Sequence, residues 1–465
     1  MLLDLDHAPG RSLRVRMENA LRDAIRSGLL APGTRVPSTR ALAAQLEVSR
    51  GVVVEAYAQL AAEGYLRTRG GAGTTVAAAA STTAAIDGRR PCIHPPAPAA
   101  PAIHYDLSPF VPALHAFPRK AWAAALSRVL RDAPDERLAL PAGAGVPELR
   151  VALAAYLARV RGVRAGAEQV VVCNGLRQGL GLLWSALAAD GAKTVVIEDP
   201  GWRGMAETVT DAGLTTMPIA VDDQGISVVH LAGQRARIDA VAVAPAHQYP
   251  TGAVLSPARR PALVQWAQQH RALIVEDDYD AEYRYDREPI GSLQGLAPEH
   301  VVYSGSTSKS LAPAVRLAWL VVPPRLVAPM SALQRRRGGM PAALQQLALA
   351  ELIQRGELDR HLRRQRRAYR RQRDALLVAL SERLPEATVH GAAAGLFVTL
   401  RLPAGADEQR VIGLARAAGV AVQGLGVAGP GLVVGYANLA QAAVAPAVAV
   451  LAASVRGASG RGANF

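Results

Sequence analysis

Residues 77–103 separate two stretches of the chain that have ordinary globular patterns. This segment is rich in Ala, Pro, Ser and Thr, has almost no hydrophobic periodicity and contains the run HPPAPAAPA. Such a composition favours an extended, semi-rigid connection. A chain of 465 residues is also too long for one ordinary core. We therefore expect two domains, over residues 11–76 and 106–460, joined by an Ala/Pro-rich linker over residues 77–105.

Composition excludes several classes of protein. The chain has no run of about 18 uninterrupted apolar residues, which a membrane-spanning helix requires. Its first residues, MLLDLDHAPGR, lack the basic and apolar regions of a secretion signal. Its two cysteines, Cys92 and Cys173, indicate neither a disulfide framework nor a metal site. We expect a cytoplasmic protein without a metal, and the formal charge of +14 is compatible with a polyanionic partner.

Residues 11–76 have the pattern of a compact helical unit that ends in a hairpin. Apolar residues recur at helical spacing from Leu13 to Ile25, and Ser38 and Ser49 are placed to cap two further helices. The expected elements are helices over 12–27, 39–46 and about 50–63, followed by two short strands within 65–76. The short turn between the second and third helices and the glycine-rich hairpin are typical of a winged helix-turn-helix.

A winged helix-turn-helix predicts a surface that binds double-stranded DNA. Arg50, at the start of the third helix, can bridge O6 and N7 of a guanine, and Arg40 on the preceding helix can hold a phosphate. The residues expected to contact DNA are Arg40, Ser49, Arg50, Gly51, Arg67, Arg69 and Gly71. The alternative is a helical interaction domain with no role in DNA binding. The charge of residues 1–76, ten Arg against seven Asp and Glu, does not decide between the two.

From about residue 106 onward, short apolar runs alternate with helical patterns. The runs that we expect to form strands cover residues 170–173, 194–199, 240–245, 273–278 and 301–306, with a helix over 257–270. Apolar strands separated by helices indicate a mostly parallel sheet that is covered on both faces. Residues from about 340 to the end, with long helices and two or three strands, suit a smaller subdomain. The fold class is therefore α/β.

Lys309 is the amine that the sequence singles out. The chain has three lysines, Lys120, Lys193 and Lys309. Lys309 follows a predicted strand, among the hydroxyl residues of GSTSKS, and Arg316 comes shortly after it. Hydroxyls and one arginine are suitable ligands for a phosphate, and an amine beside a phosphate is what an aldehyde cofactor needs. The alternative is a lysine that merely carries surface charge.

Three other motifs supply complementary groups. Asp277 and Tyr279 lie two residues apart and so share one side of an extended strand, where a carboxylate and a phenol can contact a pyridine nitrogen and its O3′. In CNGLRQGL, a glycine turn opens a helix whose amides, from Gly175 to Arg177, can bind phosphate. Trp202 follows a strand end in EDPGW and can stack on a cofactor ring, although Trp in an ordinary core is the alternative. For Asp278, Asp280 and Glu282 we favour caps of the next loop.

These motifs, in this order, resemble those of known families. VPSTRALAAQLEVSRGVVVEAYAQLAAEGYLRTRGGAGT resembles the DNA-binding domain of the GntR family along its whole length. PAGAGVPELR, CNGLRQG, EDPGW, APAHQYPTG, EDDYD and SGSTSKSLAPAVR resemble the corresponding motifs of fold-type I enzymes that use pyridoxal 5′-phosphate (PLP). The combination is similar to the MocR/GabR-like subgroup of GntR transcription regulators, in which a winged helix-turn-helix precedes an aminotransferase-like domain.

The resemblance implies a role for individual residues. Lys309 would hold PLP as an aldimine, Asp277 would contact the ring nitrogen and Tyr279 the O3′, and these three would be the catalytic residues. The expected cofactor-binding residues are Lys309, Asp277, Tyr279, Gly175, Leu176, Trp202, His247, Tyr249, Ser306, Ser308 and Arg316. His247 and Tyr249 would line the pocket without an assigned role. Family members are usually head-to-tail dimers.

The chain departs from the family pattern at two positions. Arg177 stands where many aminotransferases have Gln. In GLVVGYAN, Val433 stands where aminotransferases and GABA-sensing members carry an arginine that clamps the carboxylate of the substrate. Without that bidentate anchor, an amino acid is harder to bind by its α-carboxylate. Arg203 and Arg177 are the candidates that could replace it.

Three functions remain open from the sequence. The first is a transcription regulator whose effector is PLP or an adduct of PLP with an amine or amino acid, including the PdxR-type case that controls vitamin B6 synthesis. The second is a working aminotransferase with an appended DNA-binding module. The third is a DNA-binding architectural protein whose large domain binds nothing. The arginine run over residues 360–373 is typical either of a nucleic-acid patch or, as we favour, of a solvated helix face, because Leu362, Tyr369 and Leu376 recur opposite it.

Overall fold

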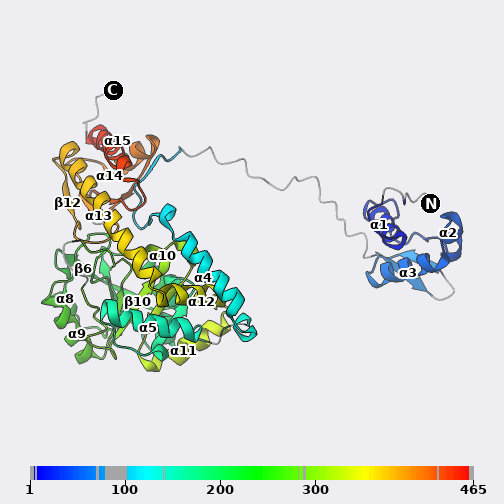
Figure 1. The fold of residues 1–465 in the computed structure, drawn as a ribbon, viewed down its shortest axis with the longest axis horizontal. Helices are drawn as coiled ribbons and strands as arrows, with labels where there is room; N and C mark the ends of the chain where they lie inside the picture. Colours follow the sequence, from blue (N-terminus) through cyan, green and yellow to red (C-terminus); the bar gives the residue numbers. More distant parts are fainter. Residues whose placement is uncertain are drawn as a thin grey trace. The chain divides into compact units, whose positions relative to one another are not determined.

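The computed structural model describes residues 5, 8–69, 73–78, 102–139, 141, 143–280, 282–285, 290–426 and 429–459. The chain divides into two compact units, Met1–Ala100 and Pro101–Phe465, which Figure 1 shows in blue and in cyan to red. Most of the segment expected as a linker, residues 79–101, lies outside the described residues.

The first unit contains three helices and a hairpin, as a winged helix-turn-helix requires. Its elements are α1 (Leu13–Arg26), α2 (Thr39–Gln45), α3 (Arg50–Ala62), β1 (Leu66–Arg69) and β2 (Gly73–Val76). The hydroxyls of Ser38 and Ser49 accept hydrogen bonds from Ala41 and Val52 at 3.2 and 3.4 Å, so both predicted caps are present. The core is formed by fully buried side chains from all three helices: Met17, Leu21, Leu42, Val53 and Leu60.

The second unit is built on an eight-stranded, mostly parallel sheet. Its strands are β4 (Val170–Cys173), β5 (Thr194–Asp199), β6 (Thr215–Asp222), β7 (Gly225–Ile226), β8 (Ala240–Val243), β9 (Leu273–Asp277), β10 (Val301–Ser306) and β11 (Ala318–Val321). Their order is β4-β11-β10-β9-β8-β5-β6-β7. The five strands from β10 to β6 are parallel neighbours, whereas β11 is antiparallel to β10 and β4. The α/β expectation is confirmed, but β6, β7 and β11 were not among the predicted strands.

Helices cover both faces of this sheet. The helices of this part of the chain are α4 (Arg119–Asp132), α5 (Pro147–Arg161), α6 (Leu176–Ala189), α7 (Arg203–Asp211), α8 (Val228–Ala232), α9 (Arg259–His270), the single turn α10 (Thr307–Ser310), α11 (Pro324–Arg336) and α12 (Ala343–Gln354). Successive residues of β4 point to opposite faces: Val171 packs in the cluster that contains α6, α7 and α11, and Val172 packs in the cluster that contains α5 and α12. This double coverage explains why the strands read as continuous apolar runs.

A smaller subdomain follows along the chain. Its antiparallel sheet has the order β12-β13-β16-β15. The elements are α13 (Glu357–Arg383), β12 (Thr388–His390), β13 (Phe397–Arg401), α14 (Glu408–Ala417), β14 (Val420–Ala421), β15 (Gln423–Gly424), β16 (Gly431–Gly435) and α15 (Gln441–Ser459). Strand β3 (Tyr105–Asp106), from the beginning of this unit, pairs in parallel with β14. The chain therefore contributes its first strand after the linker to the small subdomain.

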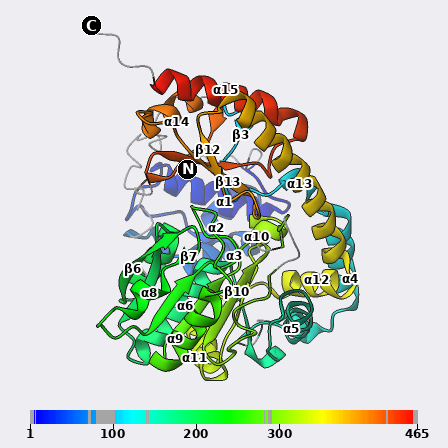
Figure 2. The same cartoon turned by 90° about the vertical axis from the view of Figure 1, so that its left-hand side faces the viewer.

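Helix α15 is long and apolar enough, by composition, to cross a membrane. In the folded unit it packs against α13 and α14, with which it lies side by side in Figures 1 and 2. Val448, Leu451 and Val455 on its inner face are buried. This packing is that of a core helix in a globular subdomain.

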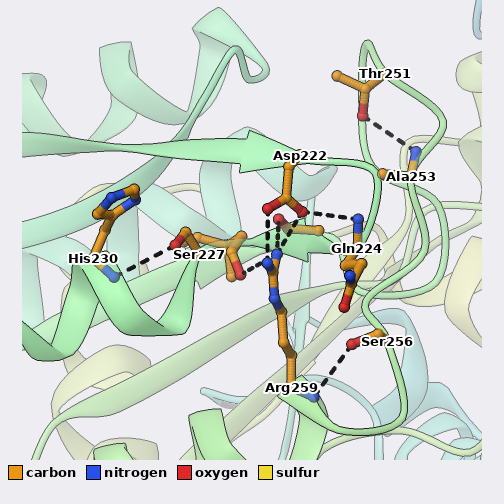
Figure 3. Close-up of polar contacts among 10 residues, drawn as sticks. Asp222, Gln224, Ser227, His230, Thr251, Ala253, Ser256 and Arg259 are labelled. Carbon is orange, nitrogen blue, oxygen red and sulfur yellow. Dashed lines mark hydrogen bonds and ion pairs between the residues drawn. The ribbon is translucent and has the colours of Figure 1, made fainter.

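An arginine holds the edge of the large sheet. Arg259, at the start of α9, pairs with Asp222 at the end of β6, with Nη1–Oδ1 and Nη2–Oδ2 distances of 2.6 and 2.7 Å. The same guanidinium donates to the carbonyls of Gly225 and Ile226 in β7. Figure 3 shows the pair of Arg259 with Asp222. The short edge hairpin β6–β7 is thereby fixed to the helix layer.

Candidate functional site

A cavity of about 230 Å³ lies at the carboxyl ends of β5, β8, β9 and β10, where ligands bind in open α/β sheets. Its lining residues are Phe110, Leu176, Arg177, Ile197, Glu198, Gly201, Trp202, Met205, Ala242, Val243, Ala244, Tyr249, Asp277, Tyr279, Ser306, Ser308, Lys309 and Arg316. The cavity thus brings together nine of the eleven residues expected to bind a cofactor. Gly175 and His247 are not among the lining residues.

Lys309 lies on the single-turn helix α10, directly after β10. Its Nζ donates a hydrogen bond to the carbonyl of Phe110 at 2.8 Å and lies 5.0 Å from the centre of the Phe110 ring. Burial lowers the pKa of Lys309 to about 8, although the nearby Asp280 and Asp277 act in the opposite direction. The amine is therefore more often neutral, and more nucleophilic, than an exposed lysine.

Asp277 ends β9 and presents its carboxyl group to the same cavity. Burial is the largest cause that raises its pKa to about 7, and the charge of Asp278 adds to the effect. The hydroxyl of Ser304 donates to Oδ1 at 3.3 Å. A buried carboxyl in this position is suited to a partner that brings a positive N–H, such as the ring nitrogen of PLP.

The cavity also contains hydrogen-bond donors of the kind that a phosphate needs. Gly175 has a φ of +89° and precedes α6, and a Cβ at this position would lie 2.9 Å from Nη2 of Arg316. The same Nη2 donates to the carbonyl of Asn174 at 2.8 Å. The cavity is lined by Arg316, Ser306, Ser308 and, at the start of α6, Leu176, which are the kinds of group that an anion site requires. Gly175 does not line the cavity, but the absence of a side chain at this position leaves room for the guanidinium of Arg316. We call Arg316, Ser306, Ser308 and the start of α6 the phosphate cradle.

His247 is buried beside the cavity, in contact with Tyr279. Its Nδ1 lies 2.8 Å from Oδ2 of Asp280, and Tyr279 donates to the carbonyl of His247 at 2.7 Å. The Nε2 of His247 is buried without a hydrogen-bond partner among the described residues. His247 is therefore not among the residues that line the cavity, but it contacts Tyr279, which does line it.

Asp278 and Asp280 do not cap the loop after β9. Asp278 forms a buried ion pair with Arg161 at 2.7 Å, in which both side chains are 3% exposed, and Asp280 pairs with His247. The expected capping role was wrong for these two acids because the chain buries them in the protein interior, where a charge must have a partner.

Trp202 and Arg177 form the outer part of the cavity. Trp202 immediately precedes α7, and the guanidinium of Arg177 lies 5.5 Å from the centre of its ring. Arg177 also pairs with Glu207 at 2.5 Å, and Arg203 pairs with the same carboxylate at 3.1 Å. Both arginines line an adjoining hollow of about 610 Å³ that reaches Gln423–Gly426. Glu207 balances one of these two positive charges, so the three side chains together carry a net charge of +1 at this hollow.

Val433 lies in an apolar environment. It is fully buried in β16, in a cluster with Phe397 and Leu425, against which Phe110, Tyr249 and Tyr279 pack. An arginine in this place would need a buried anion that the described part of this cluster does not provide. The wall nearest the small subdomain is consequently aromatic and aliphatic.

Phe110 and Glu198 are among the lining residues that were not expected from the sequence. Phe110 belongs to no motif and lies 199 residues before Lys309 in the chain. Glu198 is part of EDPGW, and its place at a strand end next to Trp202 was a usable signal. Its Oε2 accepts a hydrogen bond from the amide of Ala244 at 3.2 Å, and burial raises its pKa to about 8.

The expected DNA contacts lie on the surface of the first unit. Arg40, Ser49, Arg50, Gly51 and Arg67 are exposed. Ser49 uses its hydroxyl to cap α3. The backbone of Arg69 pairs with Gly73 in the hairpin, but its side chain, like Gly71, lies outside the described residues. The exposed face of α3 also carries Val54, 45% exposed, which is four residues after Arg50 and so lies beside it.

The arginine run lies on α13. Leu362, Tyr369 and Leu376 are buried on one face, as their spacing predicted. Three arginines of the run donate hydrogen bonds to backbone carbonyls: Arg366 to Glu282, Arg370 to Tyr285 and Arg373 to Ala392. Part of the run therefore holds the loop that follows Asp277 and Tyr279.

Comparison with known proteins agrees with both units. Residues 112–451 match the family described as aminotransferase class I and II, and residues 13–76 match the bacterial regulatory proteins of the gntR family. A crystal structure of LysN, an α-aminoadipate aminotransferase from Thermus thermophilus in complex with N-(5′-phosphopyridoxyl)-L-leucine, is 25% identical with a TM-score of 0.69, and the match covers 76% of this chain and 92% of that one. The aminotransferase fold implies pyridoxal phosphate as cofactor, and the donors in the cavity fit it.

Full-length relatives combine the same two units. The probable rhizopine catabolism regulatory protein MocR of Rhizobium meliloti is 34% identical over 400 residues, 82% of this chain and 80% of the relative. The pyridoxine biosynthesis transcriptional regulator PdxR of Corynebacterium glutamicum is 33% identical over 415 residues, 86% of both chains. The chain therefore belongs to the MocR/GabR-like subgroup of the GntR family of transcription regulators, which bind DNA through the N-terminal unit.

Proposed function

We propose that this regulator changes its affinity for DNA when PLP occupies Lys309. The observation that carries the proposal is the convergence of Lys309, Asp277 and the phosphate cradle around Arg316 in one cavity, on a chain that also has a winged helix-turn-helix. A ligand can shift the DNA-binding equilibrium only if it binds the two states of the protein with different affinity. The protein would act in the cytoplasm as a head-to-tail dimer.

Each residue has a defined part in this proposal. Lys309 supplies the nucleophilic amine, and Asp277 holds a proton on the ring nitrogen. Ser306, Ser308 and Arg316, with the amides of Gly175 and Leu176, hold the phosphate, while Trp202 covers one face of the ring. Tyr279 would turn the single hydrogen of its hydroxyl from the carbonyl of His247 to the ring oxygen, and Tyr249 closes the side nearest the small subdomain. When bound, PLP supplies an electrophilic carbon and an electron-withdrawing ring.

The environment of Val433 favours PLP itself as the signal. An amino-acid effector needs a partner for its carboxylate, and the wall around Val433, where aminotransferases carry the clamping arginine, is apolar. The apolar wall is compatible with a PdxR-type function, in which the vitamin controls its own synthesis. A primary amine without a carboxylate is the second class of effector that the wall accommodates.

A working aminotransferase is the alternative function, favoured by the match of residues 112–451 to the aminotransferase class I and II family. The two functions differ in turnover. The protein is incubated with PLP and a panel of amino acids, keto-acid release is followed, and DNA footprints are recorded with and without PLP. A footprint that depends on PLP, together with less than one keto acid released per protein, supports the regulator. Steady release over many turnovers with an unchanged footprint would establish the enzyme instead.

Attachment of PLP should accelerate as the pH rises towards 8. The neutral amine is the nucleophile, and with a pKa of about 8 roughly a tenth of Lys309 is neutral at pH 7, compared with well under a thousandth for an ordinary lysine. PLP attached to Lys309 should give an absorbance band near the visible range. The rate at which this band appears should therefore rise about tenfold per pH unit below pH 8 and level off above it. A rate that keeps rising beyond pH 10 would show that Lys309 titrates as an exposed lysine.

Arg50→Ala should weaken specific DNA binding selectively. Loss of a bidentate contact to a guanine costs about 1–3 kcal/mol, so affinity for a selected operator should fall about 5- to 150-fold while affinity for random DNA changes much less. Arg40→Ala, a phosphate contact, should weaken both to a similar degree and lower the salt dependence by about one ion. Equal losses on both DNAs for Arg50→Ala would remove it from base recognition.

A further inference from the structure

Phe110 has an unusual backbone conformation. Its φ is +68°, in the left-handed region. A residue with a side chain adopts this conformation at a cost of about 1–2 kcal/mol, whereas glycine does not pay it. Such conformations persist where the surroundings impose them, and they gather at functional sites. The surroundings of Phe110 are the cavity: its carbonyl accepts the hydrogen bond from Lys309, and its ring lines the same space.

The ring of Phe110 joins the two subdomains of the large unit. Its centre lies 4.6 Å from that of Tyr249 and 5.4 Å from that of Tyr279, both on loops of the large sheet. It also lies 5.6 Å from Phe397, which belongs to β13 of the small sheet. These distances are those of interacting aromatic pairs. One residue therefore contacts the reactive lysine, the loops around it and the small subdomain.

The segment before Phe110 is fixed to the small subdomain by its backbone. The amides of His104 and Leu107 donate to the carbonyls of Gly419 and Ala421, both at 2.8 Å, and the amide of Gly435 donates to the carbonyl of Leu107 at 2.7 Å. A Cβ at Gly435 would lie 2.2 Å from the carbonyl oxygen of Ser108, so the two backbones are in close contact. Residues 104–108 must therefore move together with the small sheet.

We propose that Phe110 couples the state of Lys309 to the segment that leads to the DNA-binding unit. Residues 79–101 connect the two units in sequence, and residues 104–110 are the first part of the large unit after them. The free amine of Lys309 is held by the Phe110 carbonyl, so the segment and the small sheet are tied to the large sheet. This inference rests on the proposed function and assigns its first mechanical step.

The chemistry of attachment removes this tie. When the nitrogen of Lys309 bonds to the aldehyde carbon of PLP, the aldehyde oxygen leaves as water with two of the hydrogens of the ammonium group. The nitrogen keeps one hydrogen and forms a new double bond, with no net oxidation. The Phe110 carbonyl then loses its donor or must share the one that remains, and the left-handed conformation loses one of the contacts that hold it. Covalent occupancy thus weakens the attachment of the segment 104–110 to the large sheet, which then keeps the ring contacts of Phe110 with Tyr249 and Tyr279.

The test compares full-length variants with and without saturating PLP. The affinity for an operator selected in vitro is measured by fluorescence anisotropy, and hydrogen exchange of the peptide 104–112 is followed by mass spectrometry. Phe110→Gly removes the ring and relieves the backbone strain, whereas Phe110→Leu keeps apolar volume. Phe117→Leu is the matched control, because Phe117 contacts Trp122 at 5.9 Å between ring centres and is not among the residues that line the cavity.

We expect PLP to change the operator affinity of the wild type and of Phe117→Leu by about fivefold or more. In Phe110→Gly, at a PLP concentration at which mass spectrometry shows Lys309 fully occupied, the change should fall below about twofold, and exchange of the peptide 104–112 should no longer respond to PLP. Phe110→Leu should lie between them. A full response in Phe110→Gly would overturn the role of Phe110 and leave the proposed function intact. A wild type that does not respond to PLP would overturn the proposed function itself.

Discussion

Replacing Lys309 by alanine is expected to abolish covalent binding of PLP. Lys309 is the lysine in the cavity, whereas Lys120 and Lys193 are exposed on the surface. After incubation with PLP and reduction with borohydride, mass spectrometry should find the pyridoxyl group on the Lys309 peptide of the wild type. In Lys309→Ala this mass tag and the absorbance band near the visible range should both be lost.

Lys193→Ala is the matched control, and it should bind PLP as the wild type does. DNA binding of Lys309→Ala in the absence of PLP should remain, because the winged helix-turn-helix forms its own core. A tag that survives in Lys309→Ala and disappears in Lys193→Ala would refute the assignment of the site.

Replacing Asp277 by asparagine should weaken PLP binding and stabilise the PLP-free fold. A buried carboxylate opposite a positive ring nitrogen is worth about 3–5 kcal/mol when its partner is present, so the affinity for PLP should fall by about 100-fold or more. Without that partner, the buried charge of the carboxylate lowers the stability of the folded state. Its pKa is raised from 3.8 to about 7, so the folded state binds a proton that the unfolded chain releases, and stability falls as the pH rises from about 4 to 7.

Asp277→Asn lacks this pH-dependent penalty. Its free energy of unfolding without PLP should therefore exceed that of the wild type at pH 8, by an amount of the order of 1 kcal/mol or more, and the difference should shrink at pH 5. Asp222→Asn is the control at the other end of the sheet. It removes an exposed ion pair with Arg259 that lowers the pKa of Asp222, so it should destabilise slightly at pH 8. If Asp277→Asn is less stable than the wild type at pH 8, the buried carboxylate of Asp277 does not carry the desolvation penalty that its raised pKa implies.

The sequence was sufficient for the parts of the site that lie in local motifs. Lys309 and Trp202 each follow a strand of the mostly parallel sheet and Asp277 ends one, so their place at the carboxyl edge follows from the alternation of strands and helices. The edge strand β7 and the antiparallel β11 were missed. Two residues are too short to give a period, and the direction of a buried strand leaves no mark on an apolar run.

Other features depend on tertiary contacts between distant residues. Phe110 reaches Lys309 through a turn that no motif announces. The partners of Asp278 and Asp280, Arg161 and His247, are 117 and 33 residues away. A charged residue after a strand looks the same in sequence whether it caps a loop or forms a buried pair, and the local pattern favoured the cap.

The most direct test of the account is the affinity of the full-length protein for an operator duplex, measured with and without saturating PLP, for the wild type and Lys309→Ala side by side. If PLP on Lys309 changes the affinity for DNA, the dissociation constants with and without PLP should differ by about fivefold or more in the wild type and coincide in Lys309→Ala. Equal dissociation constants for the wild type in both conditions, with PLP shown by mass to occupy Lys309, would contradict it.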